Sequence, residues 1–364
     1  MIPFISFSYK KDQISKEIID SIYSIIKSEK YVLGENTLEF EKNYSSLINS
    51  GYCVGVGSGL DALIIALKSL DIGPEDEVIV PSNTYIASWL AVSSVGAKIV
   101  PVEPDIETYN INPEIIENKI TKKTKAIMPV HLYGQPCDMT KIMDIAKKNN
   151  LYVVEDNAQG HMSKWKNKFT GTFGDINATS FYPTKNIGAI GEAGAITTNN
   201  SKLADYAKQY RNYGSKIKYE NNIRGTNSRI DEIQASIINV KLKYIDEMNN
   251  ERIKNAKIYN NYLKNTDIVI PHNHLDSYHT YHLYVIRHPE RDNLQKYLYN
   301  KGVQTSIHYP IIPQNQKAYA SYRFDSNPIA DQLAKTSLSL PIFPGIGQDK
   351  IEYISNLLIE FCKK

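Results

Sequence analysis

Lys185 is the side chain with the clearest chemical potential in this sequence. It lies in the segment SFYPTKNIGAIGEAGAI, between a predicted strand and a glycine-rich turn. Glycine lets backbone come close to a ligand, so a lysine placed here can reach one. When its pKa is lowered, a lysine amine can form an imine with an aldehyde and later move a proton. From this segment alone, an ordinary surface lysine remains the alternative.

Asp156 is the second candidate, because it ends the apolar run LYVVED. Acidic residues at the end of a buried strand are unfavourable unless they are paired or belong to a site. A carboxylate in this place could keep a pyridinium nitrogen protonated, and the protonated ring would then withdraw electrons from a carbanion. A helix cap or a loop salt bridge is the alternative.

Ser58 and Gly59 form the third candidate, in a turn that joins a predicted strand to a predicted helix. The free backbone N–H groups and the dipole of such a helix N-terminus favour a phosphate. Ser180, five residues before Lys185, could supply a further hydroxyl to the same phosphate. Glycine-rich turns of this kind are common, so the pattern is weak by itself.

Strand-like and helical patterns alternate through the first two thirds of the chain. Strands are expected within 53–59, 77–85, 98–103, 126–134, 151–159, 179–186 and 194–199. Helices are expected at 60–70, 86–96 and 138–150. Apolar strands separated by helices predict a mostly parallel sheet covered on both faces, an α/β fold. Ligands of such sheets bind at the carboxyl ends of the strands, where the three candidates lie.

The last part of the sequence has a different pattern. A long helix without Gly or Pro is expected from 231 to 263, followed by a strand at 278–287, a helix at 293–302, a strand at 303–310 and two more helices. This order predicts a smaller α+β domain. We therefore expect a large domain at 1–245, with an N-terminal arm, and a small C-terminal domain at 246–364.

Composition excludes several classes of protein. The 364 residues carry a net charge of only +3, with mixed signs along the chain, which favours neither nucleic acid nor a membrane surface as a partner. Three dispersed cysteines form no CxxC pair, which argues against disulfides and a structural zinc site. The beginning of the sequence does not have the pattern of a signal peptide, so a cytoplasmic location is expected.

A group of histidines in the C-terminal part is a candidate metal site. His272, His274, His279 and His282 lie close together in sequence, but no cysteine or acidic ligand has the usual spacing. Loop and strand-face histidines are the favoured interpretation, and no metal is predicted.

Nine segments, in order and at matching spacing, resemble one family over nearly the whole chain. They are VGVGSGLDAL, EVIVPSNTYIASWLAV, VPVEPDIETYNINP, PVHLYGQPCDM, VVEDNAQGH, FGDINATSFYPTKNIGAIGEAGAITTN, RNYGS, GTNSRIDEIQA and IHYP. The sequence is thereby identified as a member of the pyridoxal-phosphate (PLP)-dependent sugar-nucleotide aminotransferases of DegT/DnrJ/StrS type. The resemblance implies fold type I, with a mostly parallel seven-stranded sheet between helices and a smaller C-terminal α+β domain.

The resemblance also implies a role for each matching residue. Lys185 resembles the Schiff-base lysine, and Asp156 matches the partner of the pyridine nitrogen. Gln159 matches the residue at the ring hydroxyl, and Tyr85 looks like the aromatic residue that stacks on the ring. The remaining matches are the phosphate contacts Ser58, Gly59 and Ser180, and the sugar-pocket positions Tyr182, His308 and Tyr309.

Asn227 resembles an asparagine that reaches the phosphate from the neighbouring subunit. This implies a homodimer with shared active sites. The alternative is that Asn227 caps a helix beginning near Arg229, a common position for asparagine.

The sequence departs from the family pattern next to Asp156. Many members read EDAAQAH where this chain reads EDNAQGH, from Glu155 to His161. Asp156, Gln159 and His161 are retained, and Asn157 is expected to affect the substrate side. Some relatives have histidine in place of the lysine and catalyse dehydration, so Lys185 favours transamination over a lyase.

The predicted reaction moves an amino group from L-glutamate to a nucleotide sugar. The segments PSNTYIASWLAVS and PVEPDIETYNINP resemble the branch that acts on carbon 3 of dTDP-linked 3-keto-6-deoxyhexoses. The product would be a dTDP-3-amino-3,6-dideoxyhexose for O-antigen, surface-glycan or glycoside biosynthesis. A 4-aminotransferase of a UDP-linked 4-keto-6-deoxy sugar and a non-catalytic binding protein with this fold are the alternatives.

Overall fold

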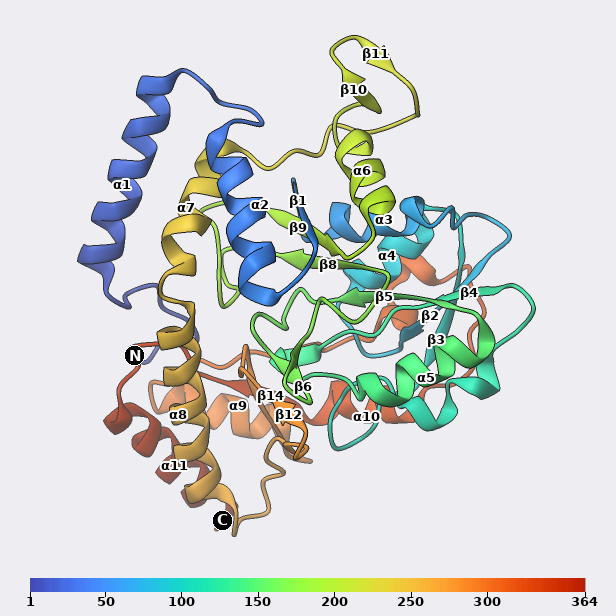
Figure 1. The fold of residues 1–364 in the computed structure, drawn as a ribbon. Coiled ribbons are helices and arrows are strands. Elements are labelled where there is room, and N and C mark those ends of the chain that lie inside the picture. Colours follow the sequence, from blue (N-terminus) through green and yellow to red (C-terminus); the bar gives the residue numbers. More distant parts are fainter. Residues whose placement is uncertain (364) are drawn as a thin grey trace.

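Seven short apolar strands form the central sheet of the protein (Figure 1). The computed structural model describes residues 1–363. In the order β1-β9-β8-β5-β4-β2-β3, the pairs from β8 to β3 are parallel, whereas β9 is antiparallel to both β1 and β8. The strands are β1 (Tyr52–Val56), β2 (Glu77–Pro81), β3 (Lys98–Val102), β4 (Thr124–Ile127), β5 (Tyr152–Asp156), β8 (Ile176–Ser180) and β9 (Gly194–Thr198).

Helices cover both faces of this sheet because alternate strand residues point to opposite sides. Val78 and Val80 of β2 join a buried cluster with α3 (Gly59–Ser69), α4 (Ile86–Ser94) and α6 (Ser201–Tyr210). Ile79, between them, belongs to a second cluster with α5 (Met139–Asn149). A third cluster joins α2 (Glu35–Ile48) and α7 (Glu232–Leu242) to the β1–β9 end of the sheet.

The N-terminal segment packs against the C-terminal part of the chain. Helix α1 (Lys11–Ser28) lies beside α7, and Ile2 bridges to Val303 of the C-terminal part (Figure 1). The C-terminal elements are α8 (Ile245–Leu263), β12 (Ser277–Tyr278), β13 (Tyr284–Arg287), α9 (Arg291–Asn300), α10 (Pro328–Thr336), β14 (Ser337–Leu340) and α11 (Gln348–Cys362). One buried cluster has all of its fully buried members between residues 256 and 358, and Ile2 of the N-terminal arm packs against it. The boundary at 245/246 stays a prediction.

Short strands and 3₁₀ turns lie outside the central sheet and its covering helices. Strands β6 (Lys164–Trp165) and β7 (Lys168–Phe169) form a small sheet with β12, and β10 (Ser215–Ile217) pairs with β11 (Glu220–Asn221) in a hairpin that projects beyond α6 (Figure 1). The 3₁₀ turns are η1 (Pro113–Ile115), η2 (Glu117–Lys119), η3 (Leu132–Gly134), η4 (Pro313–Asn315) and η5 (Lys317–Tyr319).

The predicted α/β fold with a mostly parallel seven-stranded sheet is confirmed, and three local predictions are wrong. The strand expected at 278–287 is divided into β12, which ends at Tyr278, and β13, which begins at Tyr284. Residues 303–310 form no regular strand; Val303 and Ser306 each make one isolated bridge. The helix expected at 231–263 is two helices, because α7 ends at Leu242 and α8 begins at Ile245. Tyr244, between them, packs in one cluster with Ile14 and Ile18 of α1.

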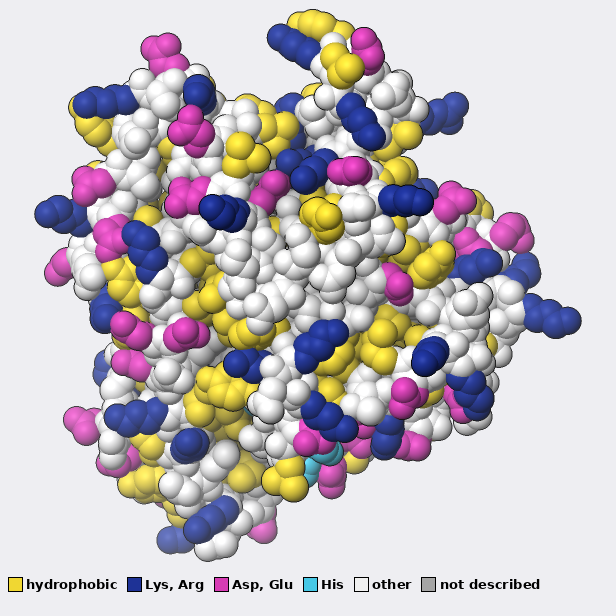
Figure 2. Space-filling view, viewed as in Figure 1, with side chains coloured by type: hydrophobic (Ala, Val, Ile, Leu, Met, Phe, Trp, Pro, Cys, Tyr) yellow, Lys and Arg dark blue, Asp and Glu magenta, His cyan; other side chains and the backbone are white. Residues whose placement is uncertain are grey.

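The surface agrees with the small net charge of the sequence. On the face drawn in Figure 2, basic and acidic side chains are interspersed among polar and apolar ones. Within residues 1–363, none of the helices has the length and apolar character needed to cross a membrane.

Gly59 should be required for the packing of α3 against β8. A Cβ at position 59 would lie 2.6 Å from Cβ of Ser180, closer than real Cβ contacts. We expect Gly59→Ala to lower the free energy of unfolding by about 1–3 kcal/mol, as overpacking does. Urea denaturation of the cofactor-free protein measures this.

Gly73→Ala is the matched control, since a Cβ at Gly73 meets nothing within 4 Å. Its unfolding free energy should stay within about 0.5 kcal/mol of the parent protein. Equal stability of the two variants would contradict the close contact between Gly59 and Ser180.

Candidate active site

The residues predicted to carry chemistry gather at one edge of the sheet. Ser58 follows β1, Tyr85 follows β2, Asp156 ends β5, and Lys185 follows β8. These strands run in the same direction, so their carboxyl ends meet at the same edge. The sheet thus brings together side chains that are up to 127 residues apart in the sequence, from Ser58 to Lys185 (185 − 58).

The N-terminus of α3 has the features of an anion site. The Ser58 hydroxyl caps the helix by accepting the N–H of Asp61 at 3.1 Å. The N–H groups of Gly59 and Leu60, in the first turn, have no acceptor within their own helix. Ser180 lies against Gly59, so its hydroxyl is beside these donors. A phosphate here would gain N–H groups, hydroxyls and the positive end of a helix dipole.

Asp156 is a buried carboxylate with neutral hydrogen-bond donors. Its side chain is held by the Ser88 hydroxyl at 2.8 Å and by the N–H of Ala158 at 3.1 Å. Burial raises the pKa of Asp156, while these two hydrogen bonds and the charge of Lys185 oppose that rise. No cationic side chain within residues 1–363 forms a salt bridge with it, so a cationic ligand group would complete its surroundings.

Lys185 is partly buried, and its surroundings favour the neutral amine. Burial lowers the pKa of Lys185 to about 8, and the negative charge of Asp156 limits the decrease. Its backbone N–H bonds to the carbonyl of Tyr182 at 2.9 Å, which fixes the turn after β8. A lysine with such a pKa supplies a substantial fraction of free amine near neutral pH, as a nucleophile or proton carrier requires.

His161 fixes the backbone on both sides of Lys185. Its Nδ1 accepts the N–H of Ile187 at 3.0 Å, so its Nε2 carries the proton that is donated to the Ser180 carbonyl at 2.9 Å. Burial lowers the pKa of His161 to about 3, and the imidazole is therefore neutral. We infer a positioning role for this residue.

Gln159 and Tyr309 connect the sheet edge to the C-terminal part. The Gln159 amide oxygen accepts the N–H of Tyr133 at 2.7 Å, and its amide nitrogen donates to the Tyr309 hydroxyl at 3.1 Å. The ring of Tyr85 lies 5.2 Å from the ring of Tyr309, tilted by 39°. Tyr85 is 53% exposed, so its ring face is open to a ligand.

His308 and Tyr182 flank this group. The carbonyl of His308 accepts the Tyr133 hydroxyl, and its Nδ1 lies 2.8 Å from the Ser339 hydroxyl. Phe4 of the N-terminal arm stacks on the His308 ring, with centroids 5.7 Å apart. Tyr182 is exposed two residues after β8. The predicted sugar-pocket residues therefore border the same edge.

Within residues 1–363, Asn227 forms no hydrogen bond with the other predicted residues, but its neighbour Ser228 contacts the anion site. Asn227 is exposed and bridges to Asn212. The Ser228 hydroxyl donates to Asp61 at 2.7 Å and accepts the N–H of Gly57 at 3.0 Å. The helix-cap alternative for Asn227 is wrong, because α7 begins at Glu232 and its cap position is Asp231.

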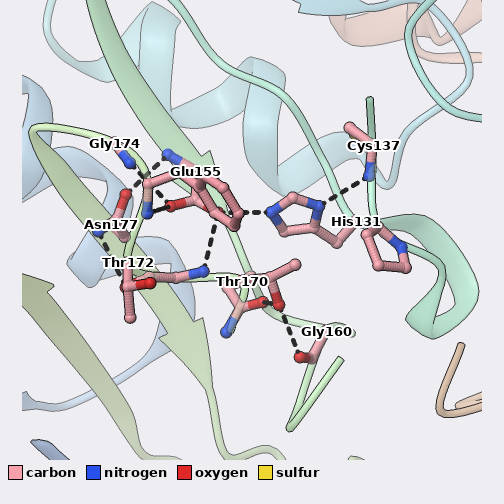
Figure 3. Close-up of polar contacts among 12 residues, drawn as sticks. His131, Cys137, Glu155, Gly160, Thr170, Thr172, Gly174 and Asn177 are labelled. Atoms are coloured by element: carbon pink, nitrogen blue, oxygen red, sulfur yellow. Dashed lines mark hydrogen bonds and ion pairs between the residues drawn. The ribbon is translucent and has the colours of Figure 1, made fainter. Parts of the chain in front are cut away.

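Glu155, next to Asp156, is the centre of a second buried network (Figure 3). Its carboxylate accepts the N–H groups of Gly171, Phe173 and Gly174 at 2.6–2.9 Å. His131 accepts the N–H of Cys137 at Nδ1, so its Nε2 proton is donated to Glu155, 2.8 Å away. This network supports β5 from the side opposite the candidate site.

Asn157 belongs to this supporting side, contrary to the expectation that it affects the substrate. It is buried, and its amide oxygen accepts the Thr170 hydroxyl at 2.7 Å. Its backbone N–H bonds to the Ala178 carbonyl of β8 at 2.8 Å. The departure from the family pattern at this position thus concerns packing between β5 and the 170–174 loop.

The arrangement fits the predicted PLP cofactor. A buried carboxylate that forms no salt bridge within residues 1–363 suits a pyridinium N–H, a lysine with a lowered pKa suits an aldehyde, and the N-terminus of α3 suits a phosphate. Sequence reasoning missed Ser88, Tyr133 and Ser228, which position the predicted residues. Ser88, one turn after Tyr85 in the apolar first two turns of α4, was the detectable signal among them.

Comparisons with known proteins agree with this site. The model of the DegT/DnrJ/EryC1/StrS aminotransferase family matches residues 12–358. A protein of Aneurinibacillus thermoaerophilus named dTDP-3-amino-3,6-dideoxy-alpha-D-galactopyranose transaminase is 48% identical over 354 residues, which are 97% of this chain and 98% of the relative.

Solved structures are similar over the full length. The crystal structure of S. venezuelae DesV in complex with a ketimine intermediate has a TM-score of 0.98 and 38% identity, covering 100% of this chain and 99% of that one. NtdA from Bacillus subtilis with bound cofactor PMP has a TM-score of 0.90 and 31% identity, covering 99% of this chain and 83% of that one.

The pKa of Lys185 can be measured in the cofactor-free protein. Competitive acylation followed by peptide mass spectrometry should give half-maximal labelling of Lys185 near pH 8, whereas an unperturbed lysine titrates at about 10.4. Because Asp156 raises this pKa, Asp156→Asn should move the midpoint below that of the parent protein. A midpoint at the ordinary lysine value, or an upward shift in the variant, would refute the proposed electrostatics.

Proposed function

Since this chain belongs to the DegT/DnrJ/EryC1/StrS aminotransferase family, we propose that it is a PLP-dependent aminotransferase of nucleotide-linked keto sugars. The observation that supports this most directly is the pair of Lys185, with a lowered pKa, and the buried Asp156 at the carboxyl edge of the sheet. The cofactor supplies an electron-withdrawing ring that stabilises a carbanion next to the transferred nitrogen.

Three groups of residues would hold the cofactor. Lys185 would bind its aldehyde through the amine, and Asp156 would accept a hydrogen bond from its protonated ring nitrogen. Ser58, Gly59 and Ser180 bind its phosphate. Tyr85 covers the ring face, and Gln159 has one amide proton left for the ring hydroxyl after bonding to Tyr309.

Lys185 also moves the proton. When its amine is free and neutral, Nζ takes the proton from the α-carbon of the amino donor, which we propose to be L-glutamate. The same nitrogen returns a proton at the sugar carbon in the second half of the reaction. The negative charge of Asp156 keeps the ring nitrogen protonated throughout, because an opposite charge nearby favours the charged form.

The proposed acceptor is a dTDP-linked 3-keto-6-deoxyhexose. The name of the Aneurinibacillus relative, at 48% identity over nearly the whole chain, supports a dTDP-3-amino-3,6-dideoxyhexose product. Tyr182, His308 and Tyr309 border the cofactor edge and are the side chains proposed to contact the sugar. Roles in lipopolysaccharide or glycoside biosynthesis follow from such a product.

Substrate specificity tests the proposal. The purified protein with PLP and glutamate should aminate a dTDP-3-keto-6-deoxyhexose with a kcat/KM at least about tenfold above that for a UDP-4-keto-6-deoxy sugar, a difference of about 1.4 kcal/mol. Mass spectrometry of the amino sugar and of released 2-oxoglutarate measures both. A preference for the UDP sugar would instead support the 4-aminotransferase.

Lys185→Ala is the control for this experiment. It should lose turnover and also the borohydride-reducible link between cofactor and protein, because no other amine replaces Nζ. If glutamate leaves the spectrum of the PLP-loaded parent protein unchanged and no 2-oxoglutarate appears, the protein binds the cofactor without transamination.

We further propose a homodimer in which Asn227 of each subunit binds the cofactor phosphate of the other. The support is the exposure of Asn227 together with its resemblance to the bridging asparagine. A two-fold interface is self-complementary, so each subunit gives one asparagine and receives one.

Subunit mixing tests the shared site. After exchange of equal amounts of Lys185→Ala and Asn227→Ala subunits, half of the dimers are mixed and each has one intact site, so activity should approach about a quarter of the parent value. Asn227→Ala alone should lose about 1.5–3 kcal/mol of phosphate binding, which makes its impairment measurable. If Asn227 serves its own subunit, as the contacts of neighbouring Ser228 would allow, activity stays at the mean of the two variants.

A further inference from the structure

A cavity of about 410 Å³ lies directly beside Lys185. Its walls come from three parts of the chain: residues 5–18 of the N-terminal arm and α1, residues 183–190 around Lys185, and Lys241, Met248 and Arg252 of α7 and α8. The volume is within the range of small-molecule sites. A ligand in this cavity would therefore lie beside the loop that carries the reactive amine.

The charges around this cavity have one sign. Its lining contains the basic residues Lys11, Lys185, Lys241 and Arg252 and, in the part of the chain that the structure describes, no Asp or Glu. The remaining walls are largely apolar, with Ile5, Ile14 and Met248 among them. Such a cavity attracts an anion with an apolar middle section.

Arg252 is the most unusual member of this lining. Its side chain is 6% exposed, and its Nη1 donates weakly to the carbonyls of Tyr281, His282 and Ile342 at 3.3–3.4 Å. Its Nε is buried without a hydrogen-bond partner among residues 1–363. Burial lowers the pKa of Arg252 to about 10, so the guanidinium stays charged at neutral pH. A buried charge without a counterion is unfavourable unless a ligand supplies one.

The neighbouring carboxylates on α8 are already engaged elsewhere. Glu251 accepts the N–H of Gly345 at 2.6 Å, and Glu247 pairs with Lys10 at 2.5 Å. Neither lines the cavity. Within residues 1–363, Arg252 therefore has no acidic partner.

Lys241 adds a second cation from α7. Lys241 is partly buried, and its Nζ donates to the Gly188 carbonyl at 2.5 Å. Gly188 belongs to the same loop as Lys185. Burial lowers its pKa, and no carboxylate opposes this decrease. Lys241 of α7 and Arg252 of α8 thus both line the cavity beside Lys185. Among the described residues, neither forms a salt bridge with a carboxylate.

We infer that this cavity binds the carboxylates of the amino donor, with Arg252 and Lys241 as the residues that recognise them. The inference rests on the proposed function. It assigns binding of the amino donor to Arg252 and Lys241, which are not among the residues proposed to hold the cofactor. The ligand class is a dicarboxylic amino acid such as glutamate, and the corresponding 2-oxo acid. The planar guanidinium, anchored by three backbone carbonyls, has the rigid fork that suits a carboxylate.

A carboxylate explains the lining better than the diphosphate of the sugar substrate. The residues proposed for the sugar, Tyr182, His308 and Tyr309, do not line this cavity. Its apolar walls suit the methylene chain of a short diacid. Arg252 and Thr184 also line an adjoining cavity of about 130 Å³ together with His308, which places the guanidinium between the donor side and the sugar side.

Binding of 2-oxoglutarate to the cofactor-free protein gives a readout independent of turnover. Isothermal titration should detect a complex with the parent protein and an affinity about 30-fold or more weaker for Arg252→Met, as expected when one partner of a buried charged contact is lost. Arg252→Lys keeps the charge without the fork and should lie between the two. An unchanged affinity in both variants overturns the inference.

Arg291→Met is the matched control. Arg291 is 7% exposed and bonds to the carbonyls of Ala334 and Ser337, as Arg252 bonds to carbonyls, but it lines neither cavity. It should change stability while leaving the affinity for 2-oxoglutarate within about twofold of the parent. An equal loss of affinity in this variant would assign the Arg252 effect to the fold and overturn the inference.

The two half reactions separate the donor from the sugar. With PLP bound, Arg252→Met and Arg252→Lys should raise the glutamate concentration for half-maximal spectral change, and leave the KM of the keto sugar within about threefold. A selective rise of the sugar KM would show a diphosphate site and overturn the carboxylate assignment. If the parent protein binds 2-oxoglutarate in an Arg252-dependent manner but does not transaminate, the proposed function fails and the anion site remains.

Discussion

A carboxylate buried at the end of β5 is the constraint around which the site is arranged. Asp156 is 5% exposed, and taking an ionised carboxyl group out of water is unfavourable unless hydrogen bonds and opposite charge replace the water. Ser88 and Ala158 provide hydrogen bonds, and Lys185 provides a charge. The same burial acts on Lys185 and lowers its pKa. Asp156 and Lys185 therefore each reduce the pKa shift that burial causes in the other.

Two acidic residues in succession would repel each other if both faced the site. Successive residues of a strand point to opposite faces, so Glu155 and Asp156 are separated by β5. Glu155 is completely buried and receives three backbone N–H groups and the His131 proton. On the Glu155 face, β5 contacts the 171–174 loop. On the Asp156 face, it contributes to the candidate site. The strand thus fixes Asp156 through contacts that never touch a substrate.

The sequence predicts the reactive residues better than it predicts what positions them. Lys185, Asp156 and Ser58 each follow a recognisable strand, and parallel strands end at a common edge, so their convergence could be anticipated. Ser228 and Arg252 come from segments whose relation to that edge depends on tertiary packing. The break between α7 and α8 lies at Tyr244, which packs against α1, a contact that only the tertiary structure reveals. The 303–310 segment has strand-like composition but lacks continuous pairing, so composition alone could not settle it.

Each of the nine matching segments is weak by itself, but nine segments in the same order and at the same spacing are specific for one family. The match of the family model to residues 12–358 confirms this prediction. The individual roles of Lys185, Asp156 and Asn227 remain predictions. Their support is local: the pKa shift of Lys185, the donors around Asp156, and the exposure of Asn227. The predicted strand 126–134 ends already at Ile127, and the loop beyond it carries Tyr133, which bonds to both Gln159 and His308.

The histidines near Lys185 add no positive charge to the site at physiological pH. Burial lowers the pKa of His161 to about 3 and of His308 to about 4, and it also lowers that of His282. These imidazoles are therefore neutral at physiological pH, and they can orient groups without adding positive charge. Arg252 stays charged, since its pKa of about 10 lies well above that range. Among these basic groups only Lys185, with a pKa of about 8, changes protonation close to neutral pH. The burial that makes the lysine reactive thus also makes it the group through which pH acts on this side of the site.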